Sequence, residues 1–284
     1  MKAVISGGRG FIGSAVSKML IDMGYDFISL SRKDLYGSAE DLCKKLNGAD
    51  LVMHLAGAPI IGRWTKKYQK EIYDSRIETT RNLANAMHLA NEKPATFICA
   101  SGVGIYPSDG VFTEADTKIA DNFLGKVCQD WEAEARKAPA GTRVLNFRFG
   151  IVLGKKGGAL PKLALPFRFF AGGRIASGKQ MVSWIHINDL VEILRFALEN
   201  PRLSGPLNIS APEVVTNAEL TKTLAKTLNR PAWFPVPAFV LKIALGKGAM
   251  VLTEGQAANP KKLLDAGYQF KFPKLKTALE DLLK

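Results

Sequence analysis

Three glycines near the start of the chain, Gly7, Gly10 and Gly13, have a spacing suited to binding a phosphate group. They lie between a short apolar segment, residues 2–5, and a helix-like run, residues 11–23. Gly7 can take the positive φ of a tight turn, Gly10 lets a pyrophosphate approach the backbone, and Gly13 lets the helix pack against its strand. Free N–H groups and the helix dipole favour an anion at such a helix start. The spacing alone is a weak signal, but its position between strand and helix predicts a dinucleotide-binding turn.

The residues that follow the second strand-like segment, residues 26–30, indicate which dinucleotide is bound. Folds that bind NAD place Asp or Glu about 20 residues after the glycine turn, where it accepts a hydrogen bond from the ribose 2′-OH. Here the strand is followed by Ser31 and Arg32. A hydroxyl and a guanidinium can hold a 2′-phosphate, and Arg9 in the glycine turn could add a second cation. The pattern predicts NADP as the cofactor; the alternative is that Arg32 is a solvated loop residue.

Strand-like and helix-like segments alternate along the first half of the chain. The expected strands cover residues 2–5, 26–30, 50–58, 96–100 and 142–148, and a long helix is expected over residues 65–90. This alternation predicts an α/β fold with a Rossmann-type, doubly wound parallel sheet. His54 lies inside the third strand and is expected to be a core residue rather than a catalyst.

The pattern loosens after residue 150, where glycines and prolines divide the chain into short elements. We expect residues 1–150 to form the dinucleotide-binding domain and residues 181–210 to return to it, with residues 181–187 as the returning strand. Residues 151–180 and 211–284 are expected to form a smaller, C-terminal α/β region on the substrate side. Within it, Thr216 and Glu219 have the spacing of a helix capping box.

The chain is basic, with 39 Lys and Arg against 26 Asp and Glu, a formal net charge of +13. These cations are spread along the sequence and no aromatic residues are interleaved with them, which favours a basic surface over a nucleic-acid partner. Arg168, Arg174 and Lys179 could contact an anionic substrate, or they could be solvated loop charges. The sequence does not indicate an oligomeric state.

Composition excludes several classes of protein. The 284 residues are 47% hydrophobic, enough for a sizeable core, yet no apolar run approaches the ~20 residues of a membrane span. The apolar run at the N-terminus is broken at Ser6, so no signal peptide is expected and a cytoplasmic location is predicted. Three scattered cysteines and three histidines show no metal-ligand or disulfide spacing, so no metal site is expected.

Several of these residues resemble, in type and order, the signatures of the extended short-chain dehydrogenase/reductases. They are the glycine turn, residues 54–57, and Ser101 followed by Tyr106. Over almost the whole chain the sequence is similar to an atypical branch of that superfamily, the NADP-binding epimerase family proteins. The marks of that branch are Glu71, Ser75, Arg76, residues 128–132, 166–168, 184–189, 254–256 and 267–270. The resemblance implies an NADP-dependent oxidoreductase or epimerase-like enzyme that acts on a small molecule, with anionic and nucleotide-linked compounds among the candidates.

The resemblance also implies further cofactor contacts beyond the glycine turn. Leu55 and Ala56 would line the cofactor from the third strand, Glu71 and Arg76 would approach it from the long helix, and Ile151 would reach its nicotinamide end. Glu71 and Arg76 are five residues apart, about 140° around an α-helix, so only an irregular turn would bring both to one ligand group. The complete set of predicted cofactor residues is Gly7, Arg9, Gly10, Phe11, Ile12, Gly13, Ser31, Arg32, Leu55, Ala56, Glu71, Arg76 and Ile151.

The chain departs from the superfamily at its proton-transfer residues. Standard members carry Tyr-x-x-x-Lys about 25 residues after the catalytic Ser, and the Tyr exchanges a proton with the substrate oxygen. The corresponding window, residues 123–132, contains neither partner at the required spacing, and Lys126 would project to another side of the helix. Ser101 and Tyr106 are therefore the predicted catalytic residues; the alternative for Tyr106 is a packed turn residue. Cys128 is either a thiol in the vacated site or a buried small side chain.

Two functions from different classes follow. The first is an NADP-dependent oxidoreductase or epimerase-like enzyme with an unusual acid/base set. The second is a protein that binds NADP(H) without turnover, as a sensor or scaffold. Loss of the Tyr and Lys favours the sensor, whereas the Ser101 turn and a substrate-side region favour the enzyme, and we expect the enzyme.

Overall fold

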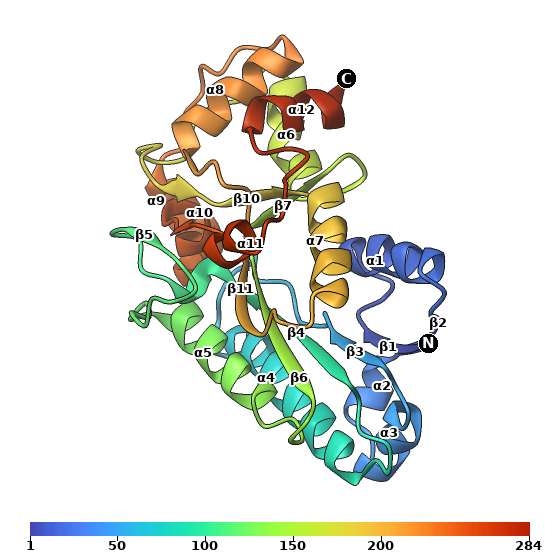
Figure 1. The fold of residues 1–284 in the computed structure, drawn as a ribbon. Coiled ribbons are helices and arrows are strands. Elements are labelled where there is room, and N and C mark those ends of the chain that lie inside the picture. Colours follow the sequence, from blue (N-terminus) through green and yellow to red (C-terminus); the bar gives the residue numbers. More distant parts are fainter.

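A six-stranded parallel sheet forms the centre of the structure (Figure 1). The structure is a computed structural model and describes residues 1–284. In spatial order the strands are β11 (Gly205–Ile209), β6 (Arg143–Phe149), β4 (Thr96–Gly102), β3 (Leu51–His54), β1 (Lys2–Ser6) and β2 (Asp26–Leu30). From β1 the chain first adds β2 on one side and then adds β3, β4, β6 and β11 on the other, so the strand order reverses between β1 and β3. The predicted doubly wound sheet is confirmed, and its reversal point is where such folds bind ligands.

Helices cover both faces of this sheet. On one face lie α1 (Phe11–Asp22) and α7 (Ile187–Glu199), whose apolar side chains pack on inward-facing residues of β1, β3 and β6. The other face carries α2 (Arg32–Leu35), α3 (Ala39–Leu46), α4 (Lys66–Leu89) and α5 (Phe123–Ala135). Side chains alternate between faces along each strand. Ala3 and Ile5 therefore join the first core and Val4 the second.

A smaller region, built mainly from the C-terminal third of the chain, lies at the carboxyl edge of the sheet (Figure 1). Its helices are α6 (Leu160–Arg168), α8 (Asn217–Leu228), α9 (Ala238–Leu245), α10 (Met250–Thr253), α11 (Lys261–Asp265) and α12 (Leu275–Leu283). Its short strands are β7 (Ile151–Gly154), β8 (Gly157–Gly158), β9 (Met181–Val182), β10 (Trp184–His186), β12 (Val215–Thr216) and β13 (Ala257–Ala258). The remaining elements are β5 (Val111–Phe112) and the 3₁₀ helices Val103–Ile105 and Gly246–Ala249. No helix combines the length and the apolar character that crossing a bilayer requires.

The chain re-enters the central sheet later than the sequence led us to expect. Residues 181–187 do not form a strand of that sheet, because β9 pairs with β12 and β10 pairs with β7. The physical reason is that β10 lies between two cores: Ile185 packs into the core of the main sheet, and Trp184 packs into the core of the smaller region. The return is made by α7 and then β11, which pairs with β6.

The outer edge of β11 is closed by side chains and loops rather than by another strand. The two carboxylate oxygens of Glu114 accept hydrogen bonds from the backbone N–H of Asn208, at 2.9 Å, and of Lys262, at 3.2 Å. The Asn208 amide donates in turn to the carbonyl of Asn259, and the Ser210 hydroxyl donates to that of Ala258. One buried carboxylate thus links the main sheet to the first turn of α11.

His54 is a core residue, as predicted. It is 0% exposed, with Nδ1 against the Ser6 hydroxyl and Nε2 3.0 Å from the Thr79 hydroxyl oxygen. Burial, helped by the positive charge of Arg76, lowers the pKa of His54 to about 3. The imidazole is therefore neutral in the folded protein at any pH above that value.

This buried histidine should make folding stability depend on acid pH. Below about pH 6.5 the unfolded chain binds a proton at His54 and the folded chain does not, so the free energy of unfolding should fall as the pH drops toward 3. The slope from this one group is at most about 1.4 kcal/mol per pH unit. Urea unfolding between pH 4 and 7 measures it. His54→Gln should flatten the slope, whereas His88→Gln, which changes an exposed histidine, should not; equal slopes in all three proteins would contradict the assignment.

Candidate functional site

The glycine turn lies between the carboxyl end of β1 and the start of α1. Gly7 has φ +75°, and a Cβ on it would lie 2.9 Å from the backbone N of Ala56. A Cβ on Gly13 would lie 2.2 Å from the carbonyl oxygen of Gly7, so only glycine fits there. Helix α1 has no side-chain cap at Gly10. Its first N–H groups therefore remain available to an anion.

A first hollow of about 390 Å³ lies beside this turn, at the strand-order reversal. Its lining includes four residues predicted to bind the cofactor, which come from the glycine turn, the start of α2, the segment after β3 and helix α4: Gly7, Arg32, Ala56 and Glu71. Arg32 is exposed, with its guanidinium carbon 5.8 Å from the centre of the Tyr36 ring. The sequence-predicted cation therefore lies at the rim of the predicted cofactor site.

Ser31 has a local structural partner. Its hydroxyl donates to a carboxylate oxygen of Asp34 at 2.7 Å and caps α2 in a capping box. The ammonium of Lys45 and the Ser31 groups hold the pKa of Asp34 at about 2. Because Lys45 neutralises Asp34, this nearby carboxylate does not cancel the charge of Arg32. The Ser31 hydroxyl would have to turn away from Asp34 to donate to a phosphate.

Helix α4 presents Glu71 and Arg76 to different places. The helix is continuous over 24 residues, so the irregular turn considered above is absent. Glu71 lines the first hollow, whereas Arg76 lines a second one. The Arg76 guanidinium donates to the carbonyls of Ile72 and Ala58, at 2.9 Å each, and lies 5.1 Å from the ring centre of Trp131. It has no carboxylate partner.

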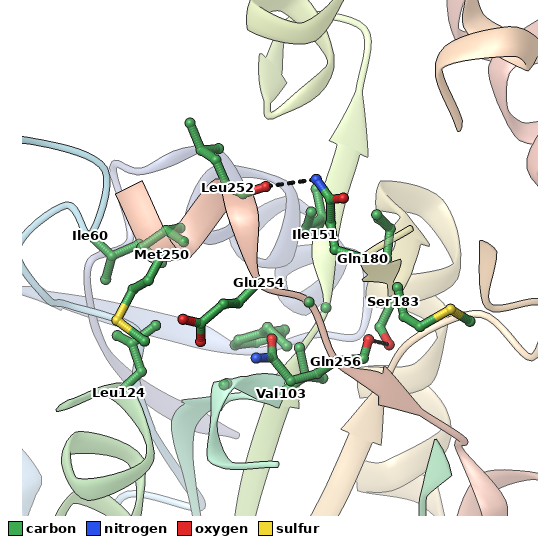
Figure 2. Close-up of a pocket in the computed structure, with 18 of the residues that line it drawn as sticks. Ile60, Val103, Leu124, Ile151, Gln180, Ser183, Met250, Leu252, Glu254 and Gln256 are labelled. Carbon is green, nitrogen blue, oxygen red and sulfur yellow. Dashed lines mark hydrogen bonds between the residues drawn. The ribbon is translucent and has the colours of Figure 1, made fainter. Parts of the chain in front are cut away.

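The second hollow, called here the central pocket, has a volume of about 330 Å³ and lies between the sheet and the smaller region (Figure 2). Of its 27 lining residues 16 are hydrophobic, and Arg76 and Glu254 are the charged ones. The end of β4 contributes Ser101, the start of β7 contributes Ile151, and α5 contributes Cys128. The remaining predicted residues line neither hollow: Arg9, Gly10, Phe11, Ile12, Gly13, Ser31 and Leu55.

Phe11 contacts the smaller region. A Cβ on Gly157 would lie 2.3 Å from its ring, so the ring fills the space beside the β7–β8 turn. Ile12 and Leu55 pack against the cores. These three side chains therefore stabilise the turn and the end of β3 by packing against neighbouring elements.

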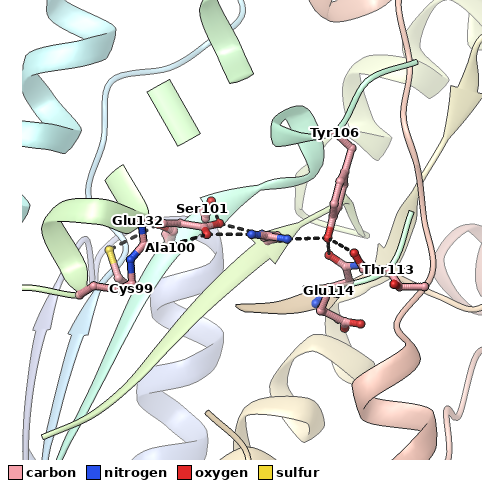
Figure 3. A network of polar contacts seen from close by, with 10 residues as sticks. Cys99, Ala100, Ser101, Tyr106, Thr113, Glu114 and Glu132 are labelled. Carbon is pink, nitrogen blue, oxygen red and sulfur yellow. Dashed lines mark hydrogen bonds and ion pairs between the residues drawn. The ribbon is translucent and has the colours of Figure 1, made fainter. Parts of the chain in front are cut away.

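Ser101 and Tyr106 belong to one buried polar network rather than to one pocket (Figure 3). The Ser101 hydroxyl donates to Glu132 at 2.8 Å, and Glu132 forms a two-bond ion pair with Arg148 at 2.7 and 2.9 Å. Arg148 then donates to the Tyr106 hydroxyl at 2.7 Å.

The environment of Tyr106 is that of a packed residue, which was the alternative left open above. Tyr106 is 1% exposed, and its hydroxyl lies 2.8 Å from the side-chain amide oxygen Oδ1 of Asn208 and 3.0 Å from the backbone carbonyl oxygen of Thr113. Burial raises its pKa. Tyr106 is absent from the lining of the central pocket, so the geometry gives no support to its predicted role as proton donor.

Helix α5 carries the window in which the superfamily has its Tyr and Lys. Lys126 is exposed and pairs with Asp130 at 2.9 Å, away from the pocket. Cys128 does line the pocket, but burial and the nearby Glu132 raise the pKa of its thiol to about 11. The thiol is therefore protonated at neutral pH.

Sequence reasoning missed several polar residues of the pocket. Glu254, Gln256, Gln180 and Asn217 all line it; residues 254–256 had been named only as a mark of the family branch, and none of the four had been assigned to a binding site. The structure explains the position of Glu254 through Gly255, where a Cβ would lie 1.9 Å from the carbonyl oxygen of Met181. A glycine that close to a distant backbone fixes the neighbouring Glu254 at the pocket.

The comparisons with known proteins agree with the fold. Residues 3–210 match the model of the NAD dependent epimerase/dehydratase family. The chain belongs to this family. Residues 236–282 of this epimerase/dehydratase-family chain match a second model, a domain of unknown function, DUF1731. The chain is 37% identical to the epimerase family protein YfhF of Bacillus subtilis, over 100% of this chain and 98% of that protein.

Solved structures extend the comparison. The family member is similar to human epimerase family protein SDR39U1 (isoform 2), crystallised with NADPH, with TM-score 0.91 and 38% identity over 99% of each chain. It also shares its fold with the UDP-glucuronic acid 4-epimerase of Bacillus cereus, at TM-score 0.78 and 19% identity over 99% of this chain and 98% of that one.

Proposed function

We propose that this epimerase/dehydratase-family chain binds NADP(H) along the carboxyl edge of its sheet and reduces a small molecule in the central pocket. The adenosine end would lie in the first hollow, the pyrophosphate on the glycine turn, and the nicotinamide near Ser101 and Ile151. The observation that carries the proposal is that α4 bounds both hollows, with Glu71 at one and Arg76 at the other. The NADPH in the human relative supports the choice of cofactor.

The glycine turn fits a pyrophosphate. Its close backbone packing leaves no room for a Cβ at Gly13, and the start of α1 offers free N–H groups without a competing side-chain cap. NADPH, when bound, supplies a hydride from its nicotinamide ring. The chain's own residues would bind and orient the cofactor, and the hydrophobic lining of the pocket would keep water from the reacting atoms.

A second function, NADP(H) binding without turnover, is favoured by one observation. The Ser101 hydroxyl donates its hydrogen to Glu132 inside the buried network and is not free to donate to a substrate oxygen. A sensor would need only the first hollow and the glycine turn. Consumption of NADPH with any substrate would exclude this alternative.

Cofactor choice tests the proposal directly. Wild-type protein should bind NADPH about 30-fold more tightly than NADH, which corresponds to about 2 kcal/mol from one or two charge-assisted hydrogen bonds of Arg32 to the 2′-phosphate. Arg32→Ala should remove most of this preference and leave NADH binding unchanged. Titration calorimetry measures all four affinities. Lys276→Ala, which removes an exposed cation of α12, is the matched control and should keep the preference. Equal affinities for NADPH and NADH in the wild type would overturn the proposal for this site.

A further inference from the structure

Two segments of the smaller region carry large apolar side chains that other parts of the chain leave uncovered. They are called here the apolar patch, and each of them is more than half exposed: Phe169, Phe170, Trp233, Phe234, Phe239 and Ile243. Monomeric soluble proteins rarely expose a large contiguous apolar surface, and one that does so usually binds a partner there.

Backbone hydrogen bonds bring the two segments of the apolar patch together. The N–H of Phe234 donates to the carbonyl of Gly172 at 3.1 Å, and the N–H of Val236 donates to that of Arg174 at 2.9 Å. The chain after α6 therefore runs beside the chain before α9. Residues that are far apart in the sequence contribute to one surface.

Helix α9 continues the apolar patch. No residue of this 8-residue helix is buried, although Lys242 is its only charged residue. Phe239 and Ile243 are four residues apart and lie on the same face of the helix. Through a 3₁₀ helix, α9 leads into α10, which lines the central pocket. The apolar patch thus adjoins the proposed site.

The two segments carry positive charge only. Residues 155–188 and 220–253 contain eleven Lys and Arg and no Asp or Glu, so they account for +11 of the net charge of +13. All eleven cations are exposed, and none forms an ion pair. Unpaired cations around an apolar surface favour a partner that is both apolar and anionic.

A hollow of about 490 Å³ brings two of these cations beside the apolar patch. Its lining includes Arg174, Lys222 and Trp233 and no acidic residue. A phosphate there could accept hydrogen bonds from both cations. Arg168, Arg174 and Lys179, which the sequence offered as contacts of an anionic substrate, do not line the central pocket. Their charge is available to another partner.

We propose that the apolar patch and its cations bind this chain to the surface of an anionic phospholipid bilayer. The aromatic rings would enter the boundary between head groups and acyl chains, and the Lys and Arg side chains would contact lipid phosphates. A second copy of the chain fits less well, because a two-fold contact would bring two cationic surfaces together. An acidic protein would need a recess for each projecting side chain, whereas a bilayer accepts them without a matching shape.

Trp233 reports the binding directly. It is 77% exposed, whereas Trp64, Trp131 and Trp184 are buried. The full-length protein is titrated with equimolar dioleoylphosphatidylcholine and dioleoylphosphatidylglycerol vesicles, and with vesicles of the phosphatidylcholine alone. The anionic vesicles should shift the tryptophan emission to shorter wavelength and bind about 10-fold or more tightly than the neutral ones, and added salt should weaken binding. Trp233→Phe should abolish the shift while the protein still co-sediments with anionic vesicles.

A matched pair of double variants tests the apolar contribution. Phe239→Ser/Ile243→Ser should lower the affinity for anionic vesicles by about 10-fold or more in co-sedimentation, because less apolar surface enters the bilayer. Ile21→Ser/Leu89→Ser changes two exposed side chains of α1 and α4 and should keep the wild-type affinity. Thermal unfolding checks that each variant is folded.

A second pair tests the charges. Arg174→Ala/Lys222→Ala should also lower the affinity for anionic vesicles by about 10-fold or more, whereas Lys18→Ala/Arg202→Ala, which removes two exposed cations elsewhere, should not. Absence of vesicle binding, equal binding to both kinds of vesicle, or equal losses in test and control variants would overturn the inference. So would a lipid-free dimer that buries Trp233, or the same emission shift with poly-L-glutamate, which would indicate an acidic protein partner. None of these measurements uses NADP(H), so the proposed function is tested separately.

Discussion

Gly13→Ala should lower the affinity for NADPH by on the order of 100-fold or more. The new Cβ would lie 2.2 Å from the Gly7 carbonyl oxygen and 2.7 Å from the Gly8 Cα, so backbone atoms must move. Displacing the turn removes N–H donors from the pyrophosphate, and each hydrogen bond to a charged group is worth about 1.5–3 kcal/mol. Titration calorimetry with NADPH measures the loss.

Gly10→Ala separates the packing of the turn from the approach of the cofactor. A Cβ on Gly10 meets only the Gly7 carbonyl oxygen, at 3.2 Å, so thermal stability should change little. The affinity for NADPH should still fall, because the methyl group would face the approaching phosphate. Wild-type affinity in Gly13→Ala would show that the pyrophosphate does not lie on this turn. Loss of folding in Gly10→Ala would contradict the packing argument.

Glu132→Leu should cost about 3–5 kcal/mol in the free energy of unfolding. Glu132 and Arg148 have side chains that are only 3% and 8% exposed, and removing the carboxylate leaves a buried guanidinium without an anion. The substitution also removes the acceptor of the Ser101 hydroxyl. Guanidinium chloride unfolding provides the measurement.

Two further variants establish the origin of this effect. The double variant Glu132→Leu/Arg148→Met should recover part of the lost stability, because no unpaired charge remains. Asp265→Asn breaks an exposed pair with Lys261 and should cost no more than about 1 kcal/mol. The ion-pair account would be contradicted if the loss of unfolding free energy in the double variant equalled the sum of the losses in Glu132→Leu and Arg148→Met.

Local patterns were sufficient to predict the elements of the main sheet. Strand β2 was predicted with its observed bounds, and α4 lies within one residue of the expected helix at each end, because capping and apolar periodicity are properties of neighbouring residues. The capping box of Thr216 and Glu219 is confirmed for the same reason. The error at residues 181–187 has another cause. When an apolar strand is buried on both faces, its sequence does not indicate which sheet the strand joins.

The site was predicted less completely, because it depends on contacts between distant segments. The glycine turn, Ala56 and Glu71 follow from a local fingerprint and a family resemblance. Nothing near Tyr106 in the sequence shows that Arg148 and Asn208 occupy its hydroxyl. Glu254 is likewise invisible as a pocket residue until the chain has folded back across Met181.

The carboxylate of Glu114 has a consequence for cooperativity. It belongs to the segment matched by the epimerase/dehydratase model, yet it binds the backbone of Lys262, which the DUF1731 model matches. Separating the two segments would expose the edge of β11 and leave one oxygen of a buried carboxylate without its donor, the Lys262 N–H. The boundary between the two family-model matches is therefore not a boundary between independently stable units. The two segments should unfold in a single thermal transition, as one foldon.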